Sequence, residues 1–189
     1  MRDKIKDIFL QSIQVKEELM QKHIGQIIGI ADIIIESLRE NGKLIVFGNG
    51  GSASDAQHIA AELVGRFKKD RTALAAIALT TNTSVLTSLA NDYGYDVVFA
   101  KQVEALAQKN DIVLGISTSG KAKNVAFGIK QAKKMGIKTI ALTGGDGGEL
   151  SRIADVSLVV PSSVTARIQE AHITIIHIVC ELVEEALSS

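Results

Sequence analysis

The sequence lacks the features that mark secreted, membrane-spanning or nucleic-acid-binding proteins. No apolar run approaches the length of a membrane-spanning helix, and the first residues contain no apolar core of the kind found in signal peptides. The single cysteine, Cys180, lies in a helical apolar pattern with no second cysteine for a disulfide, so we expect a buried thiol. The 21 basic and 21 acidic residues cancel and leave no net field for nucleic acid or an anionic membrane. We therefore expect a cytoplasmic protein without nucleic acid or membrane partners.

The chain has the length and apolar content of one compact unit. Its 189 residues, 46% of them apolar, can bury a substantial core, and no linker or low-complexity segment divides them. We expect a single domain over residues 1–189, with a helical segment at 1–40 and an α/β core at 41–189. The second half of the helical segment is apolar around too much of its circumference for a monomer surface. We predict that it packs on the sheet on one side and on another subunit on the other.

Short apolar runs alternate with helical patterns through the rest of the chain. Continuously apolar strands separated by helices indicate a parallel sheet covered on both faces, which is a three-layer αβα sandwich. In such sheets ligands bind beyond the carboxyl ends of the strands. The predicted strands are 44–47, 74–79, 111–116, 138–142 and 156–160; the predicted helices are 3–39, the segment after Gly50, about 84–90, 97–108, 122–135, 149–153 and 165–187.

One stretch, residues 43–62, combines a strand, a glycine turn and a helix. Its apolar run leads into Gly48-Asn49-Gly50-Gly51-Ser52 and then into helical periodicity. Glycines let the backbone approach a ligand closely, and the first N–H groups of the helix point at it with the positive end of the helix dipole. This pattern predicts an anion, most simply a phosphate. The same helix carries His58 and Glu62 side by side at i and i+4, although an arbitrary pair of this kind is more often a plain surface pair.

Two nucleotide-binding patterns match the sequence only in part. Gly48-x-Gly50-x-x-Ala53 fits the dinucleotide fingerprint, but the next strand ends without an acidic residue to hold a ribose. Residues 115–121 fit the start of a P-loop, but Ala122 stands where a serine or threonine would bind magnesium. We therefore expect no nucleotide cofactor.

What remains is a phosphate pocket made of neutral donors. Its donors are the backbone N–H groups of Gly50-Gly51-Ser52 and the hydroxyls of Ser117, Thr118 and Ser119. Such a pocket suits a single sugar phosphate better than a triphosphate with its metal. The alternative is that these hydroxyls only cap the next helix.

Polar residues also interrupt the apolar pattern of the terminal helix. On a helix of 3.6 residues per turn, Gln169 and His177 lie about 80° apart, whereas His172 and His177 lie about 140° apart. The two histidines are therefore not expected to face one site. Spacing alone does not choose between them.

The motifs together resemble a known family over essentially the whole chain. They are Gly48-Asn49-Gly50-Gly51-Ser52, His58-x-x-x-Glu62-Leu63-x-Gly65-Arg66, Asn91-Asp92, Gly115-Ile116-Ser117-Thr118-Ser119-Gly120, Leu142-Thr143-Gly144-x-Asp146-Gly147-Gly148 and Arg167-Ile168-Gln169-Glu170-x-His172-x-x-x-x-His177. The sequence is similar to the sugar isomerase (SIS) domain family, and within it to the bacterial phosphoheptose isomerases. This resemblance implies a flavodoxin-like five-stranded sheet, N-terminal helices used in oligomerisation, and a homotetramer with active sites between subunits.

The resemblance also implies a reaction and the residues that perform it. D-sedoheptulose 7-phosphate would become D-glycero-D-manno-heptose 7-phosphate through an enediolate, as the first step of ADP- or GDP-heptose synthesis for lipopolysaccharide or capsule. Glu62 would be the catalytic base, His177 its acid partner, and His172 structural. Substrate contacts would come from Asn49, Gly50, Gly51, Ser52, Glu62, Asn91, Asp92, Ser117, Thr118, Ser119 and Gln169, and zinc ligands from His58, Glu62, Gln169 and His177.

Two positions depart from the family pattern. Ala122 replaces a usual serine of the phosphate loop, which makes the preceding Lys121 a candidate to compensate, and Ala166 replaces an acidic residue. The competing hypothesis is a non-catalytic SIS-domain regulator that binds the replication initiator protein. Those relatives share the alanine before Arg-Ile-Gln-Glu but lack the glutamate and the last histidine. The presence of both Glu62 and His177 favours the enzyme.

Overall fold

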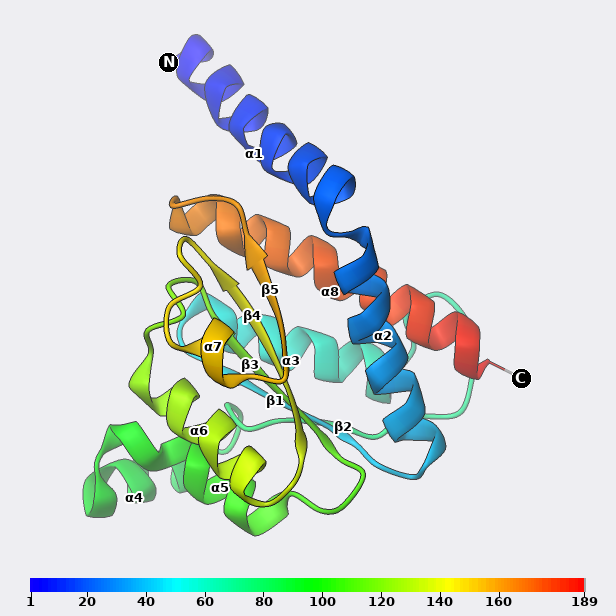
Figure 1. Ribbon diagram of the computed structural model, residues 1–189, viewed down its shortest axis with the longest axis vertical. Helices are drawn as coiled ribbons and strands as arrows, with labels where there is room; N and C mark the ends of the chain where they lie inside the picture. Colours follow the sequence, from blue (N-terminus) through cyan, green and yellow to red (C-terminus); the bar gives the residue numbers. More distant parts are fainter. Residues whose placement is uncertain (189) are drawn as a thin grey trace.

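A parallel sheet of five strands forms the middle layer of the molecule (Figure 1). The computed structural model of the chain describes residues 1–188. The strands follow the order β2-β1-β3-β4-β5, which is the flavodoxin-like order, and every neighbouring pair is parallel. Their bounds are β1 Leu44–Gly48, β2 Ala76–Ala78, β3 Ile112–Ser117, β4 Lys138–Gly144 and β5 Val156–Val160. The predicted three-layer α/β fold is confirmed.

Helices cover both faces of this sheet. One face packs against α1 (Arg2–Lys22), α2 (Ile24–Arg39), α3 (Gly51–Val64) and α8 (Thr165–Leu187). The other packs against α4 (Thr83–Tyr93), α5 (Val98–Leu106), α6 (Lys123–Lys134) and α7 (Leu150–Ile153), with a short 3-10 helix η1 (Tyr95–Val97) between α4 and α5. None of the helices in residues 1–188 combines the length and apolar character that crossing a membrane requires.

Strand β1 shows why the strands are apolar at every position. Leu44 and Val46 belong to the core on the α3 and α8 side, whereas Ile45 and Phe47 belong to the core on the α5 and α6 side. Successive side chains of a strand point to opposite faces, so a strand covered on both faces buries all of them.

The structure corrects two details of the predicted elements. The second strand is not a fully buried run over 74–79: β2 spans three residues at the edge of the sheet, and Ile77 is 36% exposed. The predicted N-terminal helix is two helices separated at His23. The first of them, α1, projects from the body of the molecule and buries only Val15 and Leu19 (Figure 1).

Candidate active site

The glycine turn after β1 lies at the point where the sheet reverses its winding. The chain leaves β1 into α3 on one face, whereas it leaves the neighbouring β3 into α6 on the other face. The carboxyl ends of these two strands therefore lie at the position where ligands usually bind in such sheets. Gly50 has a φ of +56°, and the N–H of Ser52 donates to the Asn49 carbonyl at 3.0 Å, which closes the turn into α3.

The hydroxyl loop after β3 packs tightly against the glycine loop after β4. Gly120 has a φ of +64°, and a Cβ there would lie 2.0 Å from the Gly147 carbonyl oxygen. The Leu150 N–H donates to the Gly120 carbonyl at 3.1 Å and ties the two loops together. Beside them lies a polar hollow of about 260 Å³ lined by Thr118, Ser119, Lys121, Gly144, Gly145, Asp146, Ser163, Thr165 and Ile168.

Asn49 is held by two residues that the sequence analysis did not single out. Its amide exchanges reciprocal hydrogen bonds of 2.8 Å with Asn124 of α6, and its Oδ1 also accepts from the Tyr95 hydroxyl at 3.1 Å. With Oδ1 taken by two donors, the second hydrogen of the Asn49 Nδ2 is left for a ligand. These partners are 46 and 75 residues away in the chain, so no local pattern indicated them.

Gln169 of α8 reaches the glycine turn. A Cβ on Gly51 would lie 2.2 Å from the Gln169 Nε2, so the absence of a side chain at Gly51 is what lets this amide approach. The predicted association of Gln169 with Gly51 in one site thus has a direct geometric counterpart.

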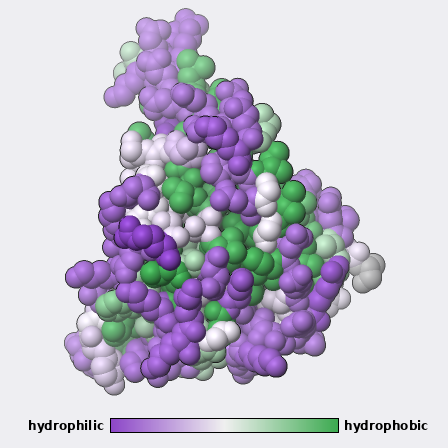
Figure 2. Space-filling view, in the orientation of Figure 1, coloured by the Kyte–Doolittle hydropathy of each residue, from purple (hydrophilic) through white to green (hydrophobic). Residues whose placement is uncertain are grey.

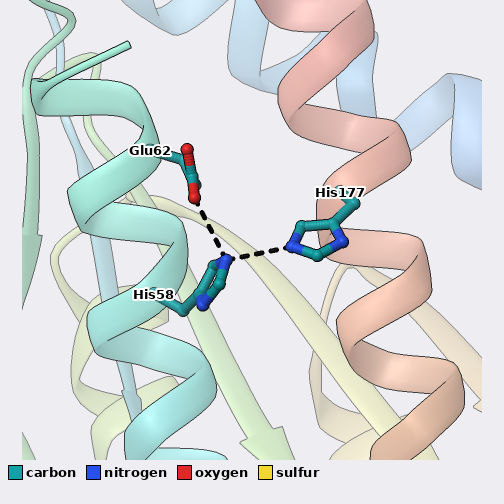
Figure 3. A group of neighbouring side chains, drawn as sticks. All are labelled: His58, Glu62 and His177. Carbon is teal, nitrogen blue, oxygen red and sulfur yellow. Dashed lines mark hydrogen bonds and ion pairs between the residues drawn. The ribbon is translucent and has the colours of Figure 1, made fainter. Parts of the chain in front are cut away.

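His58, Glu62 and His177 converge from two helices (Figure 3). The His58 Nε2 lies 3.2 Å from the Glu62 Oε1 and 2.9 Å from the His177 Nε2. One donor atom from each residue lies within 4.8 Å of the others, and all three side chains are half-buried. The ring of Phe67 packs beside His177, with ring centroids 5.6 Å apart. Two imidazoles and one carboxylate are the donor set of many catalytic zinc sites, so the three side chains fit such an ion.

Comparisons with known proteins identify the family of the chain. A family model described as the SIS domain matches residues 9–144. The phosphoheptose isomerase of Aquifex aeolicus is 54% identical over 185 residues, which cover 98% of this chain and 97% of that protein. The probable phosphoheptose isomerase of Thermoplasma acidophilum is 60% identical over 163 residues, covering 86% and 90% of the two chains. The chain belongs to the phosphoheptose isomerase branch of the SIS domain family.

Solved structures of this family superpose on nearly the whole chain. The phosphoheptose isomerase of Neisseria gonorrhoeae is 43% identical, with a TM-score of 0.93 over 97% of this chain and 98% of that one. The phosphoheptose isomerase of Francisella tularensis is 40% identical, with a TM-score of 0.94 over 97% of both chains.

The choice between the two histidines of α8 follows from their surroundings. His172 is fully buried, and its Nε2 lies 3.0 Å from the Thr143 carbonyl, so that nitrogen carries the proton. Burial lowers the pKa of His172 to about 4, which keeps the ring neutral. Its Nδ1 has no hydrogen-bond partner within residues 1–188. His177 alone of the two contacts His58, and its role in the chemistry stays a prediction.

A buried ion pair anchors the loop that follows α3. Glu184 accepts hydrogen bonds from the backbone N–H groups of Phe67, Lys68 and Lys69, and from the Arg71 Nε at 3.1 Å. Arg71 in turn donates to the Glu62 carbonyl at 3.0 Å. Burial raises the pKa of Glu184, but these donors outweigh it and hold the pKa below its usual range. The pair thus fixes Phe67 and the end of α3 beside the histidines.

Asp55 is a second carboxyl of α3 that sequence analysis passed over. It lies one turn before His58, and burial raises its pKa to about 6, partly offset by the nearby His58. Its Oδ2 has no hydrogen-bond partner in the described part of the chain.

Asn91 and Asp92 stand apart from the other predicted site residues. They lie in the last turn of α4, are exposed, and bond to each other through a 2.8 Å contact between the Asn91 Nδ2 and the Asp92 Oδ1. Within residues 1–188 neither side chain hydrogen-bonds to another predicted site residue. Their role in substrate binding stays a prediction.

Proposed function

We propose that the chain interconverts D-sedoheptulose 7-phosphate and D-glycero-D-manno-heptose 7-phosphate, supplying heptose for lipopolysaccharide or capsule. The observation that carries the proposal is the convergence of Glu62, His58 and His177, two of which lie on α3, the helix that begins at the glycine turn. It occurs in a chain that shares more than half of its residues with a curated phosphoheptose isomerase. The relatives act on a phosphorylated sugar by name, and the loops after β1 and β3 have the donors such a group needs.

The loops would bind the phosphate so that the other end of the sugar reaches Glu62. Backbone N–H groups at the start of α3 and the hydroxyls of residues 117–119 would hold the phosphate, and this binding orients C1 and C2. Asn49, Gln169, Asn91 and Asp92 would contact the sugar hydroxyls. Most of these groups sit on strand ends or helices, which is how a site keeps its geometry.

The chemistry would be two proton transfers through an enediolate. Glu62 would take a proton from C1 of the ketose, exchange it in part with solvent and deliver a proton to C2, while His177 donates a proton to the O2 carbonyl and O1 releases one. The C1–H bond breaks and the C2–H bond forms, so carbon oxidation states exchange without any external reductant. A positioned acid and base of this kind contribute about 10²- to 10⁴-fold each to the rate.

The same cluster would hold one zinc ion. His58, Glu62 and His177 would supply three ligands, and Gln169 is the proposed fourth. A carboxylate that ligates zinc is a poorer base and a zinc-bound imidazole nitrogen has no proton to donate, so metal binding would compete with the proton-transfer roles of Glu62 and His177. A zinc ion supplies Lewis-acid polarisation of a carbonyl oxygen when it is bound. Equilibrium zinc titration of the wild type and of His58→Ala tests this part: we expect one ion per chain in the wild type and at least a tenfold weaker affinity in the variant.

A homotetramer with sites between subunits completes the proposal. Helix α1 exposes Ile5, Ile8, Phe9, Leu10, Ile13 and Met20. Helix α4 carries Asn91 and Asp92 but buries no residue within the chain. Packing of neighbouring subunits on these helices would cover the apolar side chains and bring the two polar ones to a site.

The regulator hypothesis has no specific support. It predicted a chain without the glutamate and the last histidine, whereas Glu62 and His177 lie in one cluster with His58. The relatives named above are phosphoheptose isomerases.

Turnover of D-sedoheptulose 7-phosphate, followed by NMR, tests the function. We expect aldose formation by the wild type and at least a 10²-fold lower kcat for Glu62→Gln, which removes the base but keeps the size of the side chain. The matched control is Glu104→Gln on α5, an exposed partner of Lys101 on the opposite face of the sheet. Wild-type protein that never forms the aldose, with or without zinc, would exclude this substrate.

A further inference from the structure

Lys121 is the only cation among the residues that line the polar hollow beside the hydroxyl loop. Its backbone N–H donates to the Ser119 hydroxyl oxygen at 3.2 Å, so it belongs to the same turn. Its Nζ lies 3.0 Å from the Asp146 Oδ2, across the hollow in the loop after β4. The two side chains are 64% and 68% exposed.

The backbone on both sides of this ion pair is fixed, whereas the side chains are not. Gly120 and Gly147 are in such close contact that neither loop can shift toward the other. The Lys121 ammonium, on a flexible stem in solvent, can swing into the hollow at little cost. An exposed ion pair of this kind contributes only about 0–1 kcal/mol of free energy, so the Asp146 carboxylate binds the lysine weakly.

The start of α6 adds a second reason to expect an anion beside Lys121. The residue before the helix is Ala122, and no side chain caps the N-terminus. A serine or threonine there would accept from the first N–H groups of the helix. The hollow is lined by Thr118, Ser119 and Lys121 of the loop that leads into this N-terminus, so the positive end of the helix dipole favours an anion there, as the lysine charge does.

We propose that Lys121 is an additional substrate-binding residue. Its ammonium group breaks the ion pair with Asp146 and pairs instead with the phosphate of the bound sugar. Asp146 is the competing acceptor: it holds the ammonium at the mouth of the hollow in the free protein and weakens phosphate binding. A phosphate dianion at a helix N-terminus attracts an ammonium more strongly than a solvated carboxylate does, so the lysine exchanges partners. This inference rests on the proposed function, because it concerns the phosphate of the same substrate.

The exchange predicts opposite effects for the two partners. Lys121→Gln should raise the KM for D-sedoheptulose 7-phosphate by about tenfold with kcat within twofold, since a bond to a charged group is lost from ground state and transition state alike. Asp146→Asn should lower the KM by about twofold, because the lysine no longer has a competitor. In the Lys121→Gln background, Asp146→Asn should not lower the KM.

A merely structural ion pair predicts a different pattern. Both single variants would then change the KM in the same direction, and that result would overturn the inference. The control is Lys130→Gln, which breaks the 2.6 Å ion pair of Lys130 with Glu149 on the same helix, α6, and should leave the KM unchanged. An equal rise of the KM in this control would mean a general charge effect and would also overturn it.

Binding of inorganic phosphate separates this inference from the proposed function. Titration followed by the amide resonances of Ser117, Thr118, Ser119 and Gly120 needs no turnover. We expect Lys121→Gln, but not Lys130→Gln, to weaken phosphate binding severalfold even if another sugar phosphate proves to be the substrate. Normal isomerase activity with unchanged phosphate affinity in Lys121→Gln would overturn the role of Lys121 and leave the function intact.

Discussion

At the residue scale, the two histidines of α8 show how much a side chain's role depends on its surroundings. The helical periodicity of the sequence puts His172 and His177 on different faces of the helix. Both are histidines in neighbouring turns, however, so the sequence does not show which one belongs to a site. In the structure, His172 is sealed beside Thr143, whereas His177 meets His58 and Phe67 at a half-buried position. Residue type indicated the kind of chemistry; packing between α3 and α8 places His177, and not His172, beside His58.

The buried His172 predicts a pH dependence of stability. Its folded pKa of about 4 lies below the ordinary value of 6.5, so the unfolded chain binds the extra proton between these pH values. The neutral His172 ring therefore contributes fully to the unfolding free energy above pH 6.5. This contribution, up to about 3 kcal/mol, is lost as the pH falls toward 4. Urea unfolding of His172→Gln should show a smaller loss of unfolding free energy between pH 7 and pH 4 than the wild type.

His23→Gln is the matched control for this measurement. His23 lies at the junction of α1 and α2, outside the core, and its removal should keep the wild-type slope. An unchanged slope in His172→Gln would mean that His172 is not the group that takes up the proton on unfolding.

At the element scale, the glycine loops have two separate tasks. A Cβ at Gly51 would meet the far end of the Gln169 side chain, which can move aside, whereas a Cβ at Gly120 would meet the Gly147 backbone at a positive φ. Gly51→Ala should therefore unfold within about 1 kcal/mol of the wild type but lose about tenfold or more in kcat/KM, because Gln169 is displaced from the site.

Gly120→Ala should behave in the opposite way. Backbone contact and the left-handed φ both oppose the new side chain, so we expect a loss of about 2 kcal/mol or more in unfolding free energy. Comparing chemical unfolding and initial rates for the two variants checks both expectations. Equal loss of stability in the two variants would contradict this distinction, in which Gly51 makes room for the Gln169 side chain whereas Gly120 packs against the backbone of Gly147.

Most elements of the fold were predictable because their causes are local. The apolar runs of β1, β3, β4 and β5 and the glycine turn before α3 follow from strand burial and from the needs of a tight turn. The edge position of β2 was not predictable, because LAAIAL is apolar enough for a central strand. Only the strand order shows that Ile77 has a neighbouring strand on one side alone. The contacts among Asn49, Asn124 and Tyr95 were not predictable either. The turn after β1, the start of α6 and η1 meet only in the folded chain.

At the scale of the whole molecule, the projecting α1 leaves apolar surface uncovered. Figure 2 shows apolar side chains gathered on the visible face of the body below this helix. Between α1, α2 and α8 there is a groove of about 420 Å³ lined almost wholly by apolar residues, among them Met20, Ile28 and Ile178. Surface of this kind usually belongs to an interface.

Charges on α1 should therefore dissociate the proposed homotetramer. We expect the double variant Phe9→Glu/Ile13→Glu to sediment as a smaller species and to lose most of its activity, because the sites are proposed to lie between subunits. Ala105→Glu, at an exposed position of α5 on the opposite face of the sheet, should stay tetrameric and active. A wild type that sediments as a monomer and is fully active would contradict the proposed assembly.

The most direct test of the account is isomerisation in D₂O. The purified protein is incubated with D-sedoheptulose 7-phosphate, and deuterium at C2 of the aldose and at C1 of the ketose is followed by NMR, with Glu62→Gln alongside. Proton transfer through Glu62 predicts aldose that carries deuterium at C2 from the wild type, and product formation and exchange slower by at least about 10²-fold in the variant. Aldose formed by the variant at the wild-type rate would contradict Glu62 as the base of an enediolate mechanism.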